Sequence, residues 1–111
     1  LMNVKLLSLS KNEDFKSLLK GKKISNKYLT IFYKVLSNKS TNSLNISFVA
    51  QKKLGNAVIR NKVKRRLKNI MNNTIKINLK YSYLFIAKKS ILDGNFFDIK
   101  ETILKDLKKI K

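Results

Sequence analysis

The chain has 111 residues, and its 26 lysines and arginines against 6 aspartates and glutamates give a formal net charge of +20. The absence of cysteine and histidine excludes disulfide frameworks, thiolate metal sites and histidine-based acid–base catalysis. Because 43% of the residues are hydrophobic, a single folded domain over residues 1–111 is expected rather than a disordered basic tail.

The first predicted element is a short helix over Lys11–Lys20. Phe15, Leu18 and Leu19 share one face of this helix, and Asn12 is placed to cap its N-terminus. Taken alone, this spacing favours ordinary core packing for the apolar face. A further strand is expected on one side of the helix or the other, within residues 3–7 or near residues 22–27.

Two strands are predicted next, as an antiparallel pair. Residues 28–35 alternate with a period of two. One side of this strand carries Leu29, Ile31, Tyr33 and Val35, and the other carries Tyr28, Thr30, Phe32 and Lys34. Because both sides hold apolar or aromatic residues, Tyr28 and Phe32 are either core residues or a platform for unpaired bases. A polar cluster at residues 37–43 predicts the turn, and residues 44–51 the partner strand.

The principal helix is predicted over Ala57–Asn72, with Asn56 as its cap. At 100° per residue, one side is an apolar stripe made of Ile59, Val63, Leu67, Ile70 and Met71. The opposite arc is basic and polar and holds Arg60, Asn61, Lys64, Arg65 and Lys68. Arg66 falls beside the stripe, where its stem can cover core residues while its head reaches water.

A buried strand over Tyr83–Lys88 and a helix over Phe97–Lys111 complete the pattern. The acid at Asp98 opens this helix and lysines close it, as the helix dipole favours. Asp98 and Glu101 are close enough in sequence to touch one cation, but acids at a helix start more often just oppose the dipole. The order of elements predicts an α+β fold, a two-layer sandwich of a small sheet with helices packed on it.

The charges are distributed unevenly. Every acid lies near an end of the chain, and none occurs from Phe15 to Leu92. A segment of that length with positive charge alone favours a polyanion as partner, because phosphates release counterions when lysines bind them. All three arginines, Arg60, Arg65 and Arg66, fall in one short window, which suggests directed contacts to phosphates or base edges.

The string KKLGNAVIRNKVKRRLK at Lys52–Lys68 resembles the signature of the protein subunit of bacterial ribonuclease P. The matching positions are Lys52, Lys53, Gly55, Asn56, Ala57, Val58, Arg60, Asn61, Lys64 and Arg65. KNEDF at residues 11–15 and FIAKK at residues 85–89 resemble two further segments of that family. The resemblance implies a four-stranded mixed sheet with a left-handed βαβ crossover, in contrast to the usual right hand.

The resemblance also implies two RNA-binding regions. The catalytic RNA would meet the basic helix and the residues before it, namely Lys52, Lys53, Asn56, Arg60, Asn61, Lys64, Arg65 and Lys68. The single-stranded 5′ leader of precursor tRNA would lie in a cleft between the first helix and the sheet, at Phe15, Leu19, Thr30 and Phe32. Departures from the family pattern include Lys68, Leu19, Ser90 and the pair Ala50 and Gln51.

These observations predict a non-catalytic protein component of a tRNA-processing endoribonuclease whose active site lies in the RNA. Mg²⁺ is expected in the holoenzyme, held mainly by RNA phosphates and not by a protein cage. The alternatives are a ribosomal or other structured-RNA-binding protein, or a DNA-binding module that uses Ala57–Asn72 as its reading helix. No obligate protein partner is evident, and no apolar run approaches the roughly 18 residues of a membrane span, so a cytoplasmic protein is expected.

Overall fold

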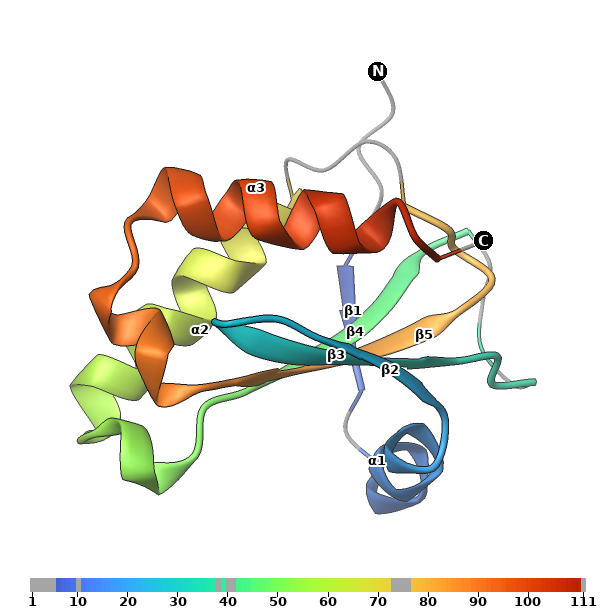
Figure 1. Cartoon of the computed structure of the whole chain (residues 1–111). Helices are drawn as coiled ribbons and strands as arrows, with labels where there is room; N and C mark the ends of the chain where they lie inside the picture. The colour runs from blue at the N-terminus through green and yellow to red at the C-terminus, as the bar shows by residue number, and fades with distance from the viewer. Residues whose placement is uncertain (1–5, 10, 38, 40–41, 73–76, 111) are drawn as a thin grey trace.

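The computed structural model describes residues 6–9, 11–37, 39, 42–72 and 77–110. Three α-helices, two 3₁₀ helices (η) and five strands follow one another along these residues (Figure 1). In chain order they are β1 (Leu6–Ser8), α1 (Asn12–Leu19), β2 (Lys22–Ser25), β3 (Leu29–Lys34), β4 (Leu44–Val49), η1 (Lys52–Leu54), α2 (Ala57–Asn72), β5 (Ser82–Ala87), η2 (Lys89–Asp93) and α3 (Phe96–Leu107).

The strands form one mixed sheet in the order β1-β4-β5-β3-β2. β5 is central, antiparallel to β3 and parallel to β4, and β1 adds to β4 in parallel. The α+β fold class is therefore confirmed, with five strands where the resemblance implied four. Helix α2 connects the parallel neighbours β4 and β5, so these three elements form the βαβ crossover that the resemblance implies. The left-handedness of this crossover stays an expectation.

The predicted pairing of the third and fourth strands is wrong. β3 pairs with β2 on one side and β5 on the other, while β4 lies beyond β5. β3 and β4 therefore do not form a hairpin, because β5 lies between them in the sheet. Both places considered for a further strand are occupied, by β2 and by the short β1, although residues 3–5 lie outside the described part of the chain.

The two faces of the sheet are covered differently. On one face, α2 and α3 pack over the main core, which contains the fully buried Leu29, Ile31, Tyr83 and Phe85. On the other face lies α1, over a smaller cluster built on Leu18 and Leu84. Figure 1 shows α2 and α3 above the sheet and α1 below it. The alternation predicted for β3 holds, since Ile31 joins the main core and Phe32 the smaller cluster.

Tyr28 belongs to the main core and not to the face of Phe32. It precedes the first residue of β3, so the period of two does not extend to it. Its hydroxyl donates a hydrogen bond to Asp98 on α3. Tyr28 therefore belongs to the packing of α3, and it is excluded as part of a base-stacking platform.

The turn between β2 and β3 is fixed by Asn26. Its side-chain oxygen accepts hydrogen bonds from the backbone N–H groups of Tyr28 (2.8 Å) and Leu29 (2.9 Å). Its amide nitrogen donates to Oδ2 of the buried Asp106 on α3 (2.8 Å). One side chain thus sets a turn and attaches it to a helix 80 residues further along the chain.

The helix boundaries agree with the sequence pattern to within a few residues, and α2 spans the predicted Ala57–Asn72. The caps are less well predicted: Lys11 precedes α1 without a side-chain cap, so Asn12 does not cap that helix. At α3 the cap is Asn95, whose side chain accepts from the N–H of Asp98 (2.8 Å). Among the described residues, none of the helices has the length and hydropathy of a membrane span.

Candidate nucleic-acid interface

Helix α2 starts from a tightly defined turn. Asn56 Oδ1 accepts a hydrogen bond from the N–H of Ile59 (3.0 Å), which confirms the predicted cap. Gly55 before it has φ 148°, a backbone conformation that side chains disfavour. A Cβ at position 55 would also come within 2.9 Å of Ile59 Cδ1. The glycine and the cap together fix the direction in which the basic helix leaves the sheet.

The buried stripe of α2 determines which of its residues face solvent. Val63, Leu67, Ile70 and Met71 are buried against the sheet and α3. Nearly all the predicted RNA-binding side chains are exposed on the remaining surface: Lys52, Lys53, Asn56, Asn61, Lys64, Arg65 and Lys68. The sequence pattern therefore placed these seven correctly with respect to solvent.

Arg60 is the exception, because it is half-buried beside the stripe. Its Nε is buried and has no hydrogen-bond partner within the described residues. A wheel at 100° per residue put Arg60 on the solvent arc, but in the structure its side chain is partly buried, so this prediction is wrong for Arg60. Arg60 therefore presents a constrained guanidinium, whereas Arg65 is free to move.

Within the described residues, no acidic side chain forms an ion pair with the cations of α2. The described residues show three ion pairs, Lys27 with Asp98, Lys39 with Asp14 and Lys109 with Asp106. None of them includes a residue of η1 or α2. A helix with this many unpaired cations repels itself, and a polyanion relieves that repulsion.

The second candidate region is the sheet face that α1 partly covers, here called the α1 face. Phe15 from α1 and Phe32 from β3 are half-buried in its apolar cluster, with Val49 and Ile86 beside them. Thr30 lies on the same face, opposite Ile86 on β5. The structure therefore brings Phe15, Thr30 and Phe32 together on one surface.

Leu19 does not belong to this cluster. It is 50% exposed at the end of α1, whereas Leu18 carries the packing of that helix and is fully buried. The apolar face predicted for α1 treated the two leucines alike, but only one residue of an adjacent pair can point at the sheet. Leu19 lies at the margin of the α1 face, on the solvent side of the helix.

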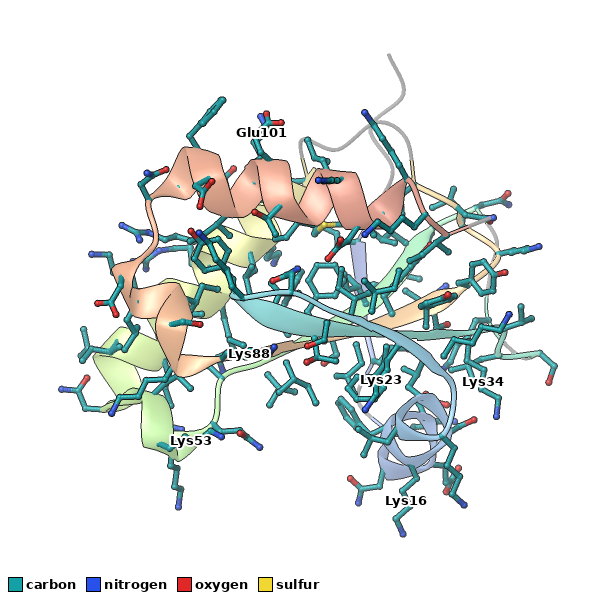
Figure 2. The ribbon with its side chains drawn as sticks, in the orientation of Figure 1. Lys16, Lys23, Lys34, Lys53, Lys88 and Glu101 are labelled. Atoms are coloured by element: carbon teal, nitrogen blue, oxygen red, sulfur yellow. The ribbon has the colours of Figure 1, made fainter. Side chains whose placement is uncertain are left out.

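Lys23 is a residue that the sequence pattern missed. It pairs in register with Phe32 across β2 and β3, so the two side chains share the α1 face. In the view of Figure 2, Lys16, Lys23 and Lys53 all lie below the sheet, on the side of α1. A strand near residues 22–27 was considered, but the sequence does not give its register, and without the register the face on which Lys23 lies cannot be assigned.

The carboxylate of Asp98 makes contacts that hold α3 to the rest of the fold. Tyr28 and Lys27 both contact Asp98, and these hydrogen bonds hold the pKa of Asp98 below its ordinary value. The described acidic side chains form no cluster of three potential metal ligands. Asp98 is thus already engaged by a phenol and an ammonium group, and it is not poised to share a cation with Glu101.

Comparison with known proteins agrees with this arrangement. A protein-family model described as Ribonuclease P matches residues 4–111. The Ribonuclease P protein component of Clostridioides difficile (strain 630) is 40% identical over 98 residues, covering 86% of this chain and 83% of that protein. The protein of the same name from Alkaliphilus oremlandii is 36% identical over 104 residues, with 92% and 89% covered.

Solved structures agree as well. The RNase P protein of Staphylococcus aureus superposes with a TM-score of 0.75 at 26% identity, covering 93% of each chain. The RNase P protein of Thermotoga maritima gives a TM-score of 0.79 at 23% identity, with 95% of this chain and 98% of that chain covered, and it shows the likeness of fold. With an exposed basic helix after the GNAV turn, a matching five-stranded fold and relatives along nearly the whole chain, the protein belongs to the ribonuclease P protein family.

Proposed function

We propose that this protein component of an endoribonuclease binds the catalytic RNA through η1 and α2, and holds the 5′ leader of precursor tRNA on the α1 face. The observation that carries the proposal is the run of exposed cations on η1 and α2 without an ion pair among the described residues. A folded chain of charge +20 with such a helix has phosphate as its natural counterpart.

The α1 face suits a single strand better than a duplex. Phe15 and Phe32 offer aromatic rings at the edge of an apolar cluster, and Lys23 stands beside them. Aromatic rings beside cations are the usual means by which proteins hold unpaired nucleotides, because each base stacks while each phosphate is neutralised. The position of Leu19 at the margin assigns it an accessory contact.

The chemistry of cleavage is assigned to the RNA. The side chains of η1 and α2 are lysines, arginines, amides and apolar groups, and the proposed contacts of the α1 face add the hydroxyl of Thr30. None of these groups serves as a general base at neutral pH without a lowered pKa. The protein's work is to reduce repulsion between RNA strands and so raise the affinity of RNA phosphates for Mg²⁺. The proposed place of this work is the cytoplasm.

Reconstitution tests the proposal. Purified protein, the organism's ribonuclease P RNA and precursor tRNA are combined, and the cleaved leader is measured as a function of magnesium concentration. The protein alone should cleave nothing, and its addition should stimulate the RNA most when magnesium is scarce. Cleavage by the protein alone, free of contaminating nuclease, contradicts the assignment of the active site; no stimulation at any magnesium concentration contradicts the proposed function.

A further inference from the structure

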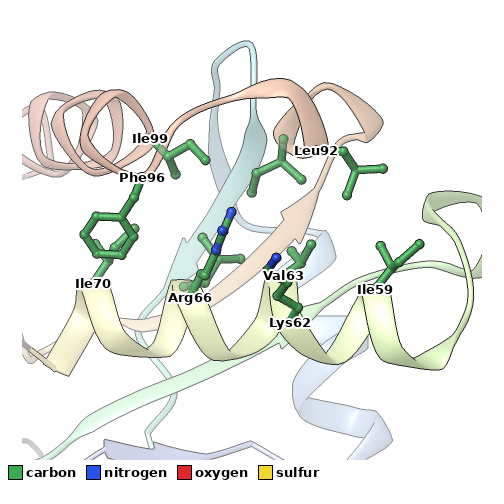
Figure 3. Close-up of a pocket in the computed structure, with 10 residues that line it drawn as sticks. Ile59, Lys62, Val63, Arg66, Ile70, Leu92, Phe96 and Ile99 are labelled. Atoms are coloured by element: carbon green, nitrogen blue, oxygen red, sulfur yellow. The ribbon is translucent and has the colours of Figure 1, made fainter.

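A pocket of about 250 Å³ lies between α2, η2 and α3, and its lining includes none of the residues predicted above for the two RNA-binding regions. We call it the α2–α3 pocket. Its apolar walls include Val63 and Ile70 from α2, Ile91 from η2 and Phe96 from α3, and its mouth carries Lys62 and Arg66. Figure 3 shows the side chains of Arg66, Lys62 and Ile59 rising from α2 toward η2 and α3.

The pocket leaves apolar surface in contact with water. Phe96 is 38% exposed and Leu92 is 40% exposed, although both line it. Each exposed apolar group costs free energy in proportion to its area, so an occupant that covers the pocket is favoured. A largely apolar hollow that opens at the protein surface is the type of site that binds a flat hydrophobic ring.

The charges at its mouth define the occupant further. Lys62 and Arg66 are exposed and lie one helical turn apart on α2. Neither has a hydrogen-bond or ion-pair partner in the part of the chain that the structure describes, and no acid lines the pocket. Asp98, the acid nearest to Phe96 and Ile99 in the sequence, is already paired with Lys27 and Tyr28. The mouth is therefore suited to an anion.

The volume limits the size of the occupant. An apolar protein cavity of about 150 Å³ accepts benzene, whereas drug-sized ligands use about 300–1,000 Å³. The α2–α3 pocket lies between these sizes, which is enough for one nucleobase and too little for the side of a helix. A second copy of this chain would bring another charge of +20 to the same surface, and an apolar peptide would gain nothing from the two cations.

We propose that the α2–α3 pocket takes one unpaired nucleobase of the catalytic RNA, stacked against Phe96, with its phosphate bound by Lys62 and Arg66. The proposal rests on the proposed function, because it names a further contact for the same partner. It differs in kind from the contacts on the solvent face of α2. Those bind the backbone irrespective of sequence, whereas a pocket that admits one ring selects an unpaired position in a folded RNA.

The test uses base-resolved chemical probing of the ribonuclease P RNA with dimethyl sulfate and carbodiimide, alone and with saturating protein. Phe96→Ala removes the stacking wall, and Phe97→Ala is its control, since Phe97 is adjacent, 70% exposed and outside the pocket. We expect one unpaired base to be protected by the wild-type protein and by Phe97→Ala, but not by Phe96→Ala. Phe96→Ala should also bind the RNA roughly 5- to 150-fold more weakly, as loss of one stacked base predicts.

A second variant guards against misfolding. Arg66→Gln changes an exposed side chain at the mouth of the pocket and keeps its apolar walls. Lys105→Gln on α3 removes the same charge at a position outside the pocket. If Phe96→Ala melts at a lower temperature, Arg66→Gln should still weaken protection of the same base while Lys105→Gln does not. The proposal is overturned if both pocket variants protect every base as the wild-type protein does, and the proposed function then stands.

Failure of the wild-type protein to bind the RNA would instead overturn the proposed function. A second copy of the chain as occupant is also detectable. The chain has no cysteine, so Leu92→Cys gives a unique thiol at the pocket whose alkylation rate can be followed. Slower alkylation on adding RNA supports the proposal, whereas slower alkylation at higher protein concentration without RNA contradicts it.

Discussion

The side chains of Arg60 and Arg65 differ in burial, and therefore in conformational freedom, although both belong to α2. The Nε of Arg60 is buried without a partner within the described residues, so its guanidinium has few orientations to lose on binding. Arg65 is exposed and pays more side-chain entropy for each contact. A constrained donor that meets a phosphate forms a charge-assisted hydrogen bond worth roughly 1.5–3 kcal/mol, more than a screened surface charge gives.

Replacing these arginines tests that difference. We expect Arg60→Ala and Arg65→Ala to weaken assembly with the RNA more than Lys105→Ala does, although each change removes one charge. Arg60→Lys should lose most of the affinity lost by Arg60→Ala, because lysine keeps the charge without the fork of donors. Equilibrium binding at fixed salt measures all four variants. Equal losses in the three alanine variants, with no loss in Arg60→Lys, would show that net charge alone matters.

Asp98 predicts a pH dependence of stability. Tyr28 and Lys27 lower its pKa in the folded protein below the ordinary value of 3.8. The unfolded chain therefore takes up a proton first as the pH falls, so the contribution of Asp98 is fully present above pH 3.8 and is lost as the pH drops through the lowered pKa. The wild-type protein should melt above Asp98→Asn at pH 7, and the gap should close in acid. A gap that is constant from pH 7 to pH 2 would contradict this prediction.

Helix α1 carries one residue that packs in the core, Leu18, and one that we assign to leader binding, Phe15. Leu18 is fully buried and joins Leu84, whereas Phe15 is half-buried at the edge of the same cluster. Leu18→Ala should therefore destabilise the fold by about 2–5 kcal/mol, as core truncations do. Phe15→Ala should reduce the preference for precursor over mature tRNA, with a smaller effect on stability. Leader-length series and melting curves measure the two effects. A loss of affinity that is independent of leader length would exclude Phe15 from leader binding.

Among the elements, the bounds and the cap of α2 were predicted correctly, although Ile59 of its predicted apolar stripe is 38% exposed, whereas the pairing of the strands was predicted wrongly. The bounds of this 16-residue helix follow from local sequence, because its four buried residues recur at helical spacing and Asn56 caps its start. Strand neighbours are set by contacts distant in sequence, so the alternation in β3 could show its two faces without showing that β5 lies beside it. The same limit left residues 22–27 as one of two possible places for a further strand, so the register that places Lys23 beside Phe32 could not be predicted.

The site was predictable to a similar extent. Exposure of the basic side chains follows from the stripe they oppose, so the residues of η1 and α2 were placed correctly except for Arg60. The α2–α3 pocket depends on where η2 and α3 lie over the sheet, and no local pattern contains that. Phe15 and Phe32 were grouped through the family resemblance, and the structure places them in one cluster.

For the whole molecule, the charge predicts a strong response to salt. If α2 and the α1 face neutralise about 6–10 phosphates, affinity for the RNA should fall by roughly 10³–10⁵ between 50 and 200 mM salt. A plot of log affinity against log salt gives the number of phosphates directly. Removing one exposed lysine, as in Lys64→Gln, should lower the slope by roughly 0.7–0.9. Affinity that is insensitive to salt would exclude phosphate contacts as the main attraction.

The central position of β5 also has a consequence for how the protein is made. Ribosomes build the chain from its N-terminus, and β5 spans Ser82–Ala87, late in the sequence. Until β5 leaves the exit tunnel, the pair of β2 with β3 and the pair of β1 with β4 have no strand to join them. The bond from Asn26 to Asp106 must wait longer still. Folding of the sheet is therefore largely deferred until β5 has been translated and has left the tunnel, and until then the two strand pairs remain unjoined.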